Sequence, residues 1–257
     1  EEGAKAEAGK PRSFHACILP ARKADGTPRF AHKGEEQLQQ MFVDMGPTQY
    51  AAQVDLSPLP GGMQPLKEEY FTKNFYRLSD IGHREGTKFI VNEEFHVAIF
   101  VDLAASLEDG ADRTAIIVRA SDPRGHIYIL EAQAGHWLPS EVFARLTRLQ
   151  RQYEARYIGC EKGPLRAAYA GSIINWNADH RAHPIVFASE IEVGGGKNRG
   201  MNDRILSLEA PAAAGMIHLL PDHKALHYEL VAYPNHPQKK DDLADTAALC
   251  VLNPYRP

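Results

Sequence analysis

Several features are scarce in this chain of 257 residues, and each scarcity narrows the possible functions. The three cysteines (Cys17, Cys160 and Cys250) lie far apart, which argues against a disulfide framework and a cysteine-based zinc site and favours a reducing cytoplasm. No apolar run reaches the roughly 18 residues that a membrane-spanning helix needs. The formal net charge is only −4, so any contact with nucleic acid must come from a local group of basic residues.

The sequence also lacks the G-x-x-x-x-G-K-[ST] motif, the loop that cradles the phosphates of a bound nucleoside triphosphate. The nearest stretch, GGGKN at residues 194–198, does not have the required spacing. We therefore expect no ATP hydrolysis from this chain.

The residue pattern divides the chain into a leading segment, residues 1–88, and a main domain, residues 89–257. Within the leading segment, apolar residues at helical spacing predict a helix within residues 34–53. The proline- and glycine-rich residues 54–66 are predicted to form an irregular connector.

The main domain begins with three predicted strands on short connections, which indicate an antiparallel meander. A helix, a fourth strand, a second helix, a fifth strand and further helices follow. The predicted strands are 95–102, 114–120, 126–133, 155–161 and 184–192, and the predicted helices are 139–154, 164–177, 203–209, 224–232 and 241–252. This is the ribonuclease H-like order, an α/β fold in which a mixed central sheet carries helices on its faces. Other α/β folds share this order, so the positions of the acidic residues matter more.

Acidic side chains stand where two of the predicted strands end. Asp102 follows the apolar residues 95–101, and Glu161 follows residues 157–160. Because the strand after the crossover helix can lie beside the first strand of a mixed sheet, we expect Asp102 and Glu161 to be neighbours at one sheet edge. The alternative is local: Asp102 would cap the following turn, and Glu161 would begin a helix, where the macrodipole favours an acid.

The stretch KKDDLAD, residues 239–245, supplies further acids at the start of the last predicted helix. Asp241 and Asp245 would share one side of this helix, while Asp242 would point about 100° away. A face of small residues would let the helix approach the sheet closely and bring these acids to its edge. The alternative is that the acids only cap the helix. The spacing leaves open which of Asp241 and Asp242 bridges a pair of metal ions.

Basic residues near these acids are candidates for contacts with DNA phosphates. Residues 194–200, GGGKNRG, combine flexible glycines with Lys197 and Arg199, and Arg204 lies just beyond. Lys162 follows Glu161 directly. The alternative for the glycine-rich stretch is a plain loop between a strand and a helix.

Histidines and tryptophans offer weaker candidates. His223 and His227 have the spacing of two zinc ligands on a helix, but no glutamate follows His223 as in HExxH and no third ligand is evident. These histidines are interpreted as surface residues, and the two tryptophans as packing residues.

Five stretches of the main domain resemble the nuclease domain of the large terminases of tailed bacteriophages. In chain order they are VDLAAS with GADRTAIIV, DPRGHIYIL, GHWLPSEVF, YIGCEK and KKDDLADTAAL, and they cover roughly residues 90–252. The earlier stretch MGPTQYAAQ, with the connector after it, resembles the end of the ATPase domain and the linker of this family.

The resemblance implies a ribonuclease H-like endonuclease that cuts concatemeric viral DNA during genome packaging. It implies two divalent metal ions, Mg²⁺ or Mn²⁺, held by Asp102, Glu161 and Asp241 or Asp242, since hard cations prefer oxygen ligands and a metal pair can clamp the scissile phosphate. The partners it implies are double-stranded DNA, the portal, the small terminase subunit and the ATPase domain of the full-length chain, at the procapsid in the host cytoplasm. The alternatives are another ribonuclease H-like nuclease, such as a junction resolvase, and a noncatalytic docking module.

Overall fold

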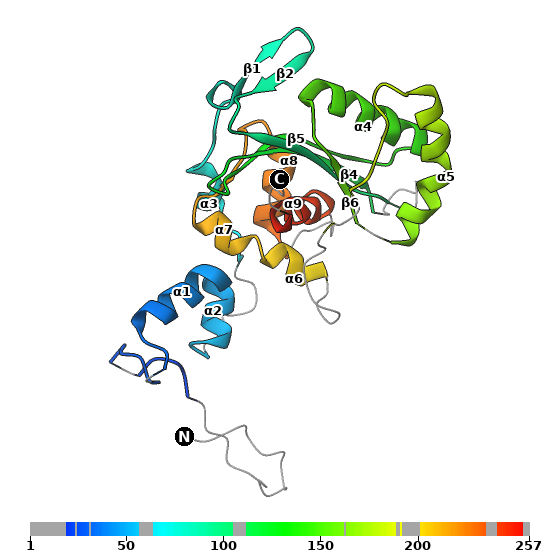
Figure 1. The fold of residues 1–257 in the computed structure, drawn as a ribbon. Helices are drawn as coiled ribbons and strands as arrows, with labels where there is room; N and C mark the ends of the chain where they lie inside the picture. The colour runs from blue at the N-terminus through cyan, green and yellow to red at the C-terminus, as the bar shows by residue number, and fades with distance from the viewer. Residues whose placement is uncertain are drawn as a thin grey trace, which may run out of the picture. The chain divides into compact units, whose positions relative to one another are not determined.

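The computed structural model describes most of the chain, and its elements are labelled in Figure 1. The described residues are 19–23, 25–30, 32–56, 64–104, 112–161, 163–188, 191, 201–234 and 241–253. They belong to two compact units, Glu1–Met63 and Gln64–Pro257. Within the described ranges, no helix combines the length and apolar character that crossing a membrane requires.

The first unit contains two short helices, α1 (Glu35–Met45) and α2 (Pro47–Gln53). Gly46 ends α1 with a φ of 77°, a left-handed value that glycine adopts at little cost. Pro47 then begins α2, where the missing N–H removes no helical hydrogen bond. The predicted helix within residues 34–53 is therefore present, and it is interrupted at the Gly-Pro pair.

The second unit is built around a five-stranded mixed sheet with the strand order β6-β3-β4-β5-β7. The strands are β3 (His96–Asp102), β4 (Thr114–Ser121), β5 (Ile127–Gly135), β6 (Ile158–Cys160) and β7 (Ile217–His218). Strands β3, β4 and β5 form an antiparallel meander, whereas β6 pairs in parallel with β3, and β7 in parallel with β5. This arrangement confirms the expected ribonuclease H-like α/β fold, with the fourth predicted strand beside the first.

Of the fifth predicted strand, residues 184–192, the structure describes residues 184–188 and 191. Among its described residues, Phe187 makes an isolated parallel bridge to Ile158 of β6. Within these described residues, the chain therefore runs parallel to β6 and pairs with it at Phe187.

The apolar residues of the strands divide between two faces of the sheet, as strand periodicity requires. On central strand β4, Ile116 and Val118 belong to one buried cluster, and Ala115 and Ile117 belong to the other. All eight residues of β4 are buried, which explains why its sequence is almost continuously apolar.

Helices cover both faces of the sheet, as Figure 1 shows. Helices α4 (Pro139–Tyr153) and α5 (Pro164–Asp179) cover one face, and α3 (Glu68–Thr72), α6 (Met201–Leu206), α7 (Glu209–Ala213), α8 (Lys224–Ala232) and α9 (Asp242–Leu252) lie on the other side. Helix α9 packs against β3, β4 and β5. Its buried residues include Ala244, Ala247 and Ala248, whose small side chains permit this close approach.

Residues 64–88 pack with the second unit, although the sequence pattern assigns them to the leading segment. Leu66 and Phe71 are fully buried in the core cluster that also contains residues of the sheet and of α7, α8 and α9. The Tyr76 hydroxyl donates a hydrogen bond of 2.7 Å to the Ile129 carbonyl. A 3₁₀ turn, η1 (Leu78–Asp80), and a hairpin of β1 (Gly82–Glu85) and β2 (Lys88–Val91) follow. The compact unit therefore begins at Gln64, because these apolar side chains complete its core.

Candidate functional site

Asp102 and Glu161 lie next to each other at one end of the sheet. The parallel register pairs Val101 with Cys160, so each acid is the residue that follows a paired position. Gly159 permits this pairing, because a Cβ atom there would come within 2.7 Å of the Phe100 ring. Both acids line a cavity of about 250 Å³, together with Cys160 and the first residues of α5. The expectation that Asp102 and Glu161 are neighbours is confirmed.

A third carboxylate, Asp245 on the first turns of α9, joins this region through Arg204 of α6. The Arg204 guanidinium donates from Nε to Asp245 Oδ1 at 2.7 Å, and a second, shorter hydrogen bond joins Nη2 to Oδ2. Its Nη1 atom donates to Glu161 Oε2 at 2.9 Å. The Arg204 and Asp245 side chains are only 8% and 3% exposed, so they form a buried bidentate pair. Arg204 thus connects two acids that come from different parts of the fold.

The acids around Arg204 carry unfavourable electrostatic energy. The pKa of Asp102 is raised to about 7, mainly by burial, with smaller contributions from the charges of Asp245, Glu161 and Asp242 and an opposing effect of Arg204. Burial raises the pKa of Asp245 to about 6, although its contacts with Arg204 act in the opposite direction. Carboxyl groups that resist ionisation because of burial and like charge are common at functional sites. A bound cation would relieve this repulsion.

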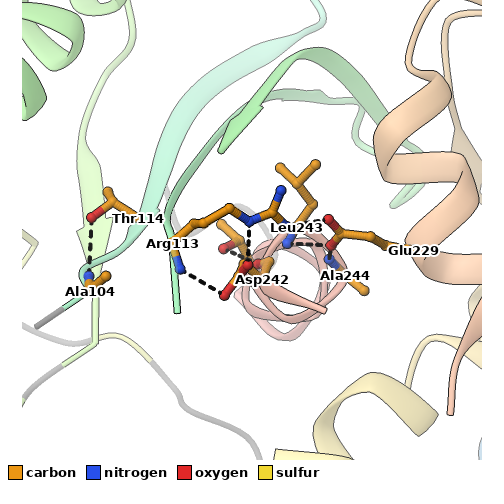
Figure 2. Close-up of polar contacts among 8 residues, drawn as sticks. Ala104, Arg113, Thr114, Glu229, Asp242, Leu243 and Ala244 are labelled. Carbon is orange, nitrogen blue, oxygen red and sulfur yellow. Dashed lines mark hydrogen bonds and ion pairs between the residues drawn. The ribbon is translucent and has the colours of Figure 1, made fainter. Parts of the chain in front are cut away.

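Asp242 takes part in a separate network at the start of α9, shown in Figure 2. Its Oδ2 atom accepts a hydrogen bond of 2.7 Å from Arg113 Nε, and its Oδ1 atom accepts one of 3.2 Å from the Arg113 backbone N–H. Arg113 also donates from Nη2 to Glu229 Oε1 at 2.6 Å. Glu229 Oε2 accepts the backbone N–H groups of Leu243 and Ala244 at 2.8 and 3.3 Å, which satisfies the free amides of the first turn of α9.

The acids expected from the sequence therefore differ in their surroundings. Asp242 is bound to Arg113 and belongs to the supporting network, whereas Asp245 is bound to Arg204. Asp241 is the N-cap residue of α9 but makes no side-chain capping bond. It lies close enough to raise the pKa of Asp245.

The basic residues proposed for DNA contact also differ in their settings. Arg204, expected to meet phosphates, is instead buried against Asp245 and Glu161, because its guanidinium neutralises their charges. Lys162, Lys197 and Arg199 lie outside the described residues.

The supporting residues Arg113 and Glu229 carried no signal in the sequence, because their partners lie more than a hundred positions away or on another helix. Asp245 did carry a signal. Its position on the same side of the last helix as Asp241 follows from helical periodicity. The signal was incomplete because periodicity does not say which side of the helix faces the sheet edge.

The donor set fits hard divalent cations in its chemistry. Asp102, Glu161 and Asp245 are oxygen ligands of the kind that Mg²⁺ and Mn²⁺ prefer, and two of them line a common cavity. In the part of the chain that the structure describes, no three such residues are close enough together to form a metal-binding group. Arg204 accounts for this, since Asp245 and Glu161 are held on its guanidinium.

No protein-family model and no curated protein matches this sequence. Solved structures do match. A large terminase from a thermophilic bacteriophage has a TM-score of 0.54 and 11% identity, over 85% of this chain and 51% of that one. The large terminase nuclease of another thermophilic phage, G20c, has a TM-score of 0.42 and 16% identity, over 72% and 96% of the two chains. The human cytomegalovirus terminase nuclease domain has a TM-score of 0.47 and 12% identity, over 71% and 90%.

At these identities the similarity to the first of these proteins, the bacteriophage large terminase, shows a common fold, and this chain spans about half of that protein. The G20c nuclease has also been solved with bound magnesium, zinc and cobalt.

Proposed function

We propose that the chain is a metal-dependent DNA endonuclease whose metal ions are held by Asp102, Glu161 and Asp245. One observation carries the proposal: Glu161 at the end of β6 and Asp245 of α9 are bound to one buried guanidinium, and Asp102 of β3 lies beside Glu161 at the same end of a ribonuclease H-like sheet. Carboxylates on rigid elements at a sheet end provide the oxygen ligands that a two-metal hydrolase requires.

The chain's own residues supply the positioning. When bound, a pair of divalent ions activates water and stabilises the leaving oxygen of a phosphodiester. Asp102 and Glu161 stand on paired strands, so their spacing is set by the sheet. Asp245 stands on a helix whose first turn is anchored by Arg113, Glu229 and Asp242. Arg204 neutralises Asp245 and Glu161, so a metal ion held by these acids would compete with its guanidinium.

The substrate in this proposal is double-stranded viral DNA cut during genome packaging. Support comes from the terminase-like sequence stretches and from the fold shared with the bacteriophage large terminase.

Lys162, Lys197 and Arg199 are proposed to contact DNA phosphates. Arg204 is instead proposed to act as the counterion of the carboxylates. The portal, the small terminase subunit and an ATPase domain in a longer chain are proposed partners at the procapsid in the host cytoplasm, and this chain by itself is proposed not to hydrolyse ATP.

The test combines plasmid cleavage with a measurement of metal binding. We expect nicking of supercoiled plasmid that requires Mg²⁺ or Mn²⁺ and stops with EDTA. Asp245→Asn should abolish cleavage and weaken Mn²⁺ binding, measured by calorimetry, by about tenfold or more. The matched variant Asp242→Asn, three residues away on the same helix, should lower thermal stability but weaken Mn²⁺ binding less than Asp245→Asn does. The reverse ranking would assign the metal to Asp242, and cleavage that persists in EDTA would exclude the mechanism.

Two alternatives are separated by the same assays. A junction resolvase would cleave four-way junctions in preference to linear duplex. A noncatalytic docking module would neither bind Mn²⁺ nor cut any DNA. The second alternative has one observation in its favour, since Arg204 forms ion pairs with two of the acids.

A further inference from the structure

A second cavity, which we call the α4–α5 pocket, lies away from the carboxylates. It has a volume of about 520 Å³ and is formed by the turn of the β1–β2 hairpin, the exposed side of α4 and the end of α5. Its lining includes Lys88, Arg148, Arg151, Thr147, Trp176 and His180. Volumes of this size are typical of sites for small-molecule ligands.

The pocket is cationic. Lys88 is neutralised by Glu154, whose carboxylate lies 2.5 Å from its ammonium group. Arg148 and Arg151 are exposed, and neither forms an ion pair with a carboxylate of the described residues. None of the described residues that line the pocket is an aspartate or a glutamate. Arg148 donates a hydrogen bond of 2.9 Å to the neutral side chain of Gln152, so no carboxylate of the described residues competes with an anion for either guanidinium group. Guanidinium binds phosphate oxygens in paired hydrogen bonds.

The wall of the pocket also contains a flat aromatic surface. The rings of Trp176 and His180 stack in parallel, with centroids 4.0 Å apart and 3° between their planes. Trp176 is fixed by a hydrogen bond of 3.1 Å from Nε1 to Thr147 Oγ1, and the His180 Nδ1 atom lies 2.9 Å from the Trp176 carbonyl oxygen. Aromatic surfaces held in place in this way attract nucleobases, which stack on them whatever the base.

We propose that the α4–α5 pocket binds a phosphate-bearing nucleotide, with Arg148 and Arg151 on the phosphate and the Trp176–His180 stack beside the base. An isolated phosphate would leave most of a cavity of about 520 Å³ empty and would make no use of the stack. An apolar ligand would make no use of the two guanidinium groups. The nucleotide is either free or the terminal unit of a DNA strand, since both present the same chemistry.

The pocket is separate from the carboxylate site. Pro164, at the start of α5, lines the cavity of Asp102 and Glu161, whereas Trp176, near its end, lines the α4–α5 pocket. At the rise of an α-helix, these two positions are about 18 Å apart. The inference therefore stands independently of the proposed nuclease activity, and its test is performed in EDTA, where no metal occupies the carboxylates.

Trp176 provides the signal for the test, because the chain has two tryptophans and Trp137→Phe leaves Trp176 alone. In this background, deoxyadenosine monophosphate is titrated against tryptophan emission, and calorimetry measures the same binding without relying on fluorescence. Deoxyadenosine, which lacks the phosphate, and inorganic phosphate, which lacks the nucleoside, are titrated separately. A 5′-phosphorylated oligodeoxyadenylate represents the strand end. We expect the nucleotide to bind about tenfold or more tightly than either deoxyadenosine or inorganic phosphate. Tighter binding of the oligonucleotide than of the nucleotide identifies a strand end as the source, and equal or weaker binding identifies the free nucleotide.

The combined variant Arg148→Gln, Arg151→Gln should weaken nucleotide binding about tenfold or more, whereas Arg148→Lys, Arg151→Lys should recover part of it. Both positions are exposed, so folding should be retained, which thermal melting checks. The control Arg124→Gln, Lys224→Gln removes the same charge from exposed sites outside the pocket lining and should change binding by about twofold at most. The proposal is overturned if the Arg148→Gln, Arg151→Gln variant binds the nucleotide as tightly as the parent does. It is also overturned if the control variant loses as much affinity, or if neither fluorescence nor calorimetry detects nucleotide binding.

Discussion

At the scale of single residues, Asp102 illustrates how a carboxylate can be placed where ionisation is unfavourable. It is the last residue of the apolar strand β3, and the carboxylates of Asp245 and Glu161 lie close enough to affect its ionisation. Burial and these like charges raise its pKa to about 7 from the ordinary value of 3.8. Such a placement lowers the free energy of unfolding of the metal-free protein. A functional role for Asp102 would explain why the residue is present despite this loss of stability.

Asp102→Asn should abolish metal-dependent cleavage and stabilise the metal-free chain. The folded state retains the Asp102 proton up to a higher pH than the unfolded state, so the parent loses stability as pH rises from about 4 to about 7. The asparagine variant does not titrate there. Its advantage should be absent near pH 4 and reach about 1–3 kcal/mol above pH 7.

Thermal or urea unfolding in EDTA across this pH range measures the effect. Glu94→Gln, which removes an exposed carboxylate just before β3, is the control and should show no such trend. A destabilised Asp102→Asn protein at neutral pH would favour a structural role for Asp102.

Arg204 acts as the counterion of the carboxylate cluster. Arg204→Gln should lower the metal-free stability by about 3 kcal/mol, because it leaves the buried Asp245 without its ionic partner. Added Mn²⁺ should raise the melting temperature of this variant more than that of the parent, since the metal no longer competes with a guanidinium. Thermal melting with and without Mn²⁺ measures both effects. Arg204→Lys is the matched variant, and an equal response to Mn²⁺ in all three proteins would count against the counterion role.

At the scale of elements, α9 depends on charges supplied by its neighbours. Its first amides bond to Glu229 of α8, and its Asp242 pairs with Arg113 immediately before β4. The same helix carries Asp245, so the anchoring of its first turn also fixes a proposed metal ligand.

Glu229→Gln should therefore destabilise the fold by about 2–4 kcal/mol and weaken Mn²⁺ binding, although Glu229 is not proposed as a ligand. The glutamine retains an acceptor for the α9 amides but loses the charge that faces Arg113. Urea unfolding and Mn²⁺ calorimetry provide the two readings. Lys224→Gln, an exposed change on the same helix, should alter neither, and an unchanged Glu229→Gln protein would exclude this anchoring role.

At the scale of the whole molecule, the chain consists of two compact units that meet in sequence at Gln64. The second unit includes Leu66, Phe71 and Tyr76, which are buried beside the sheet and its helices. Residues 64–88 therefore belong to the folding unit of the proposed nuclease.

Two fragments test this division. Residues 64–257 should fold with the metal dependence of the full chain, whereas residues 89–257 should be less stable by more than about 4 kcal/mol, because at least two large buried side chains are lost. Circular dichroism during thermal unfolding compares them. Equal stability of the two fragments would place the boundary at residue 89, as the sequence pattern suggests.

The sequence by itself determined the order of the elements and the acids at the strand ends. Apolar periodicity placed β3, β4, β5 and α4 close to their observed bounds, because buried faces leave a regular pattern. It also predicted that Asp102 and Glu161 would be neighbours, since the crossover connection places β6 beside β3. The short hairpin of β1 and β2 was not predicted, because four-residue strands carry little periodicity.

Only the tertiary structure decided which charges meet. Helical periodicity separates Asp242 from Asp241 and Asp245 but does not identify their partners. Packing of α9 against the sheet places Asp242 against Arg113 and Asp245 against Arg204. Likewise, Arg204 resembles a solvent-facing cation in the sequence and is buried in the structure. Coulombic partners are selected by distance in space, and positions 41 or 129 residues apart share no local pattern that could reveal their contact.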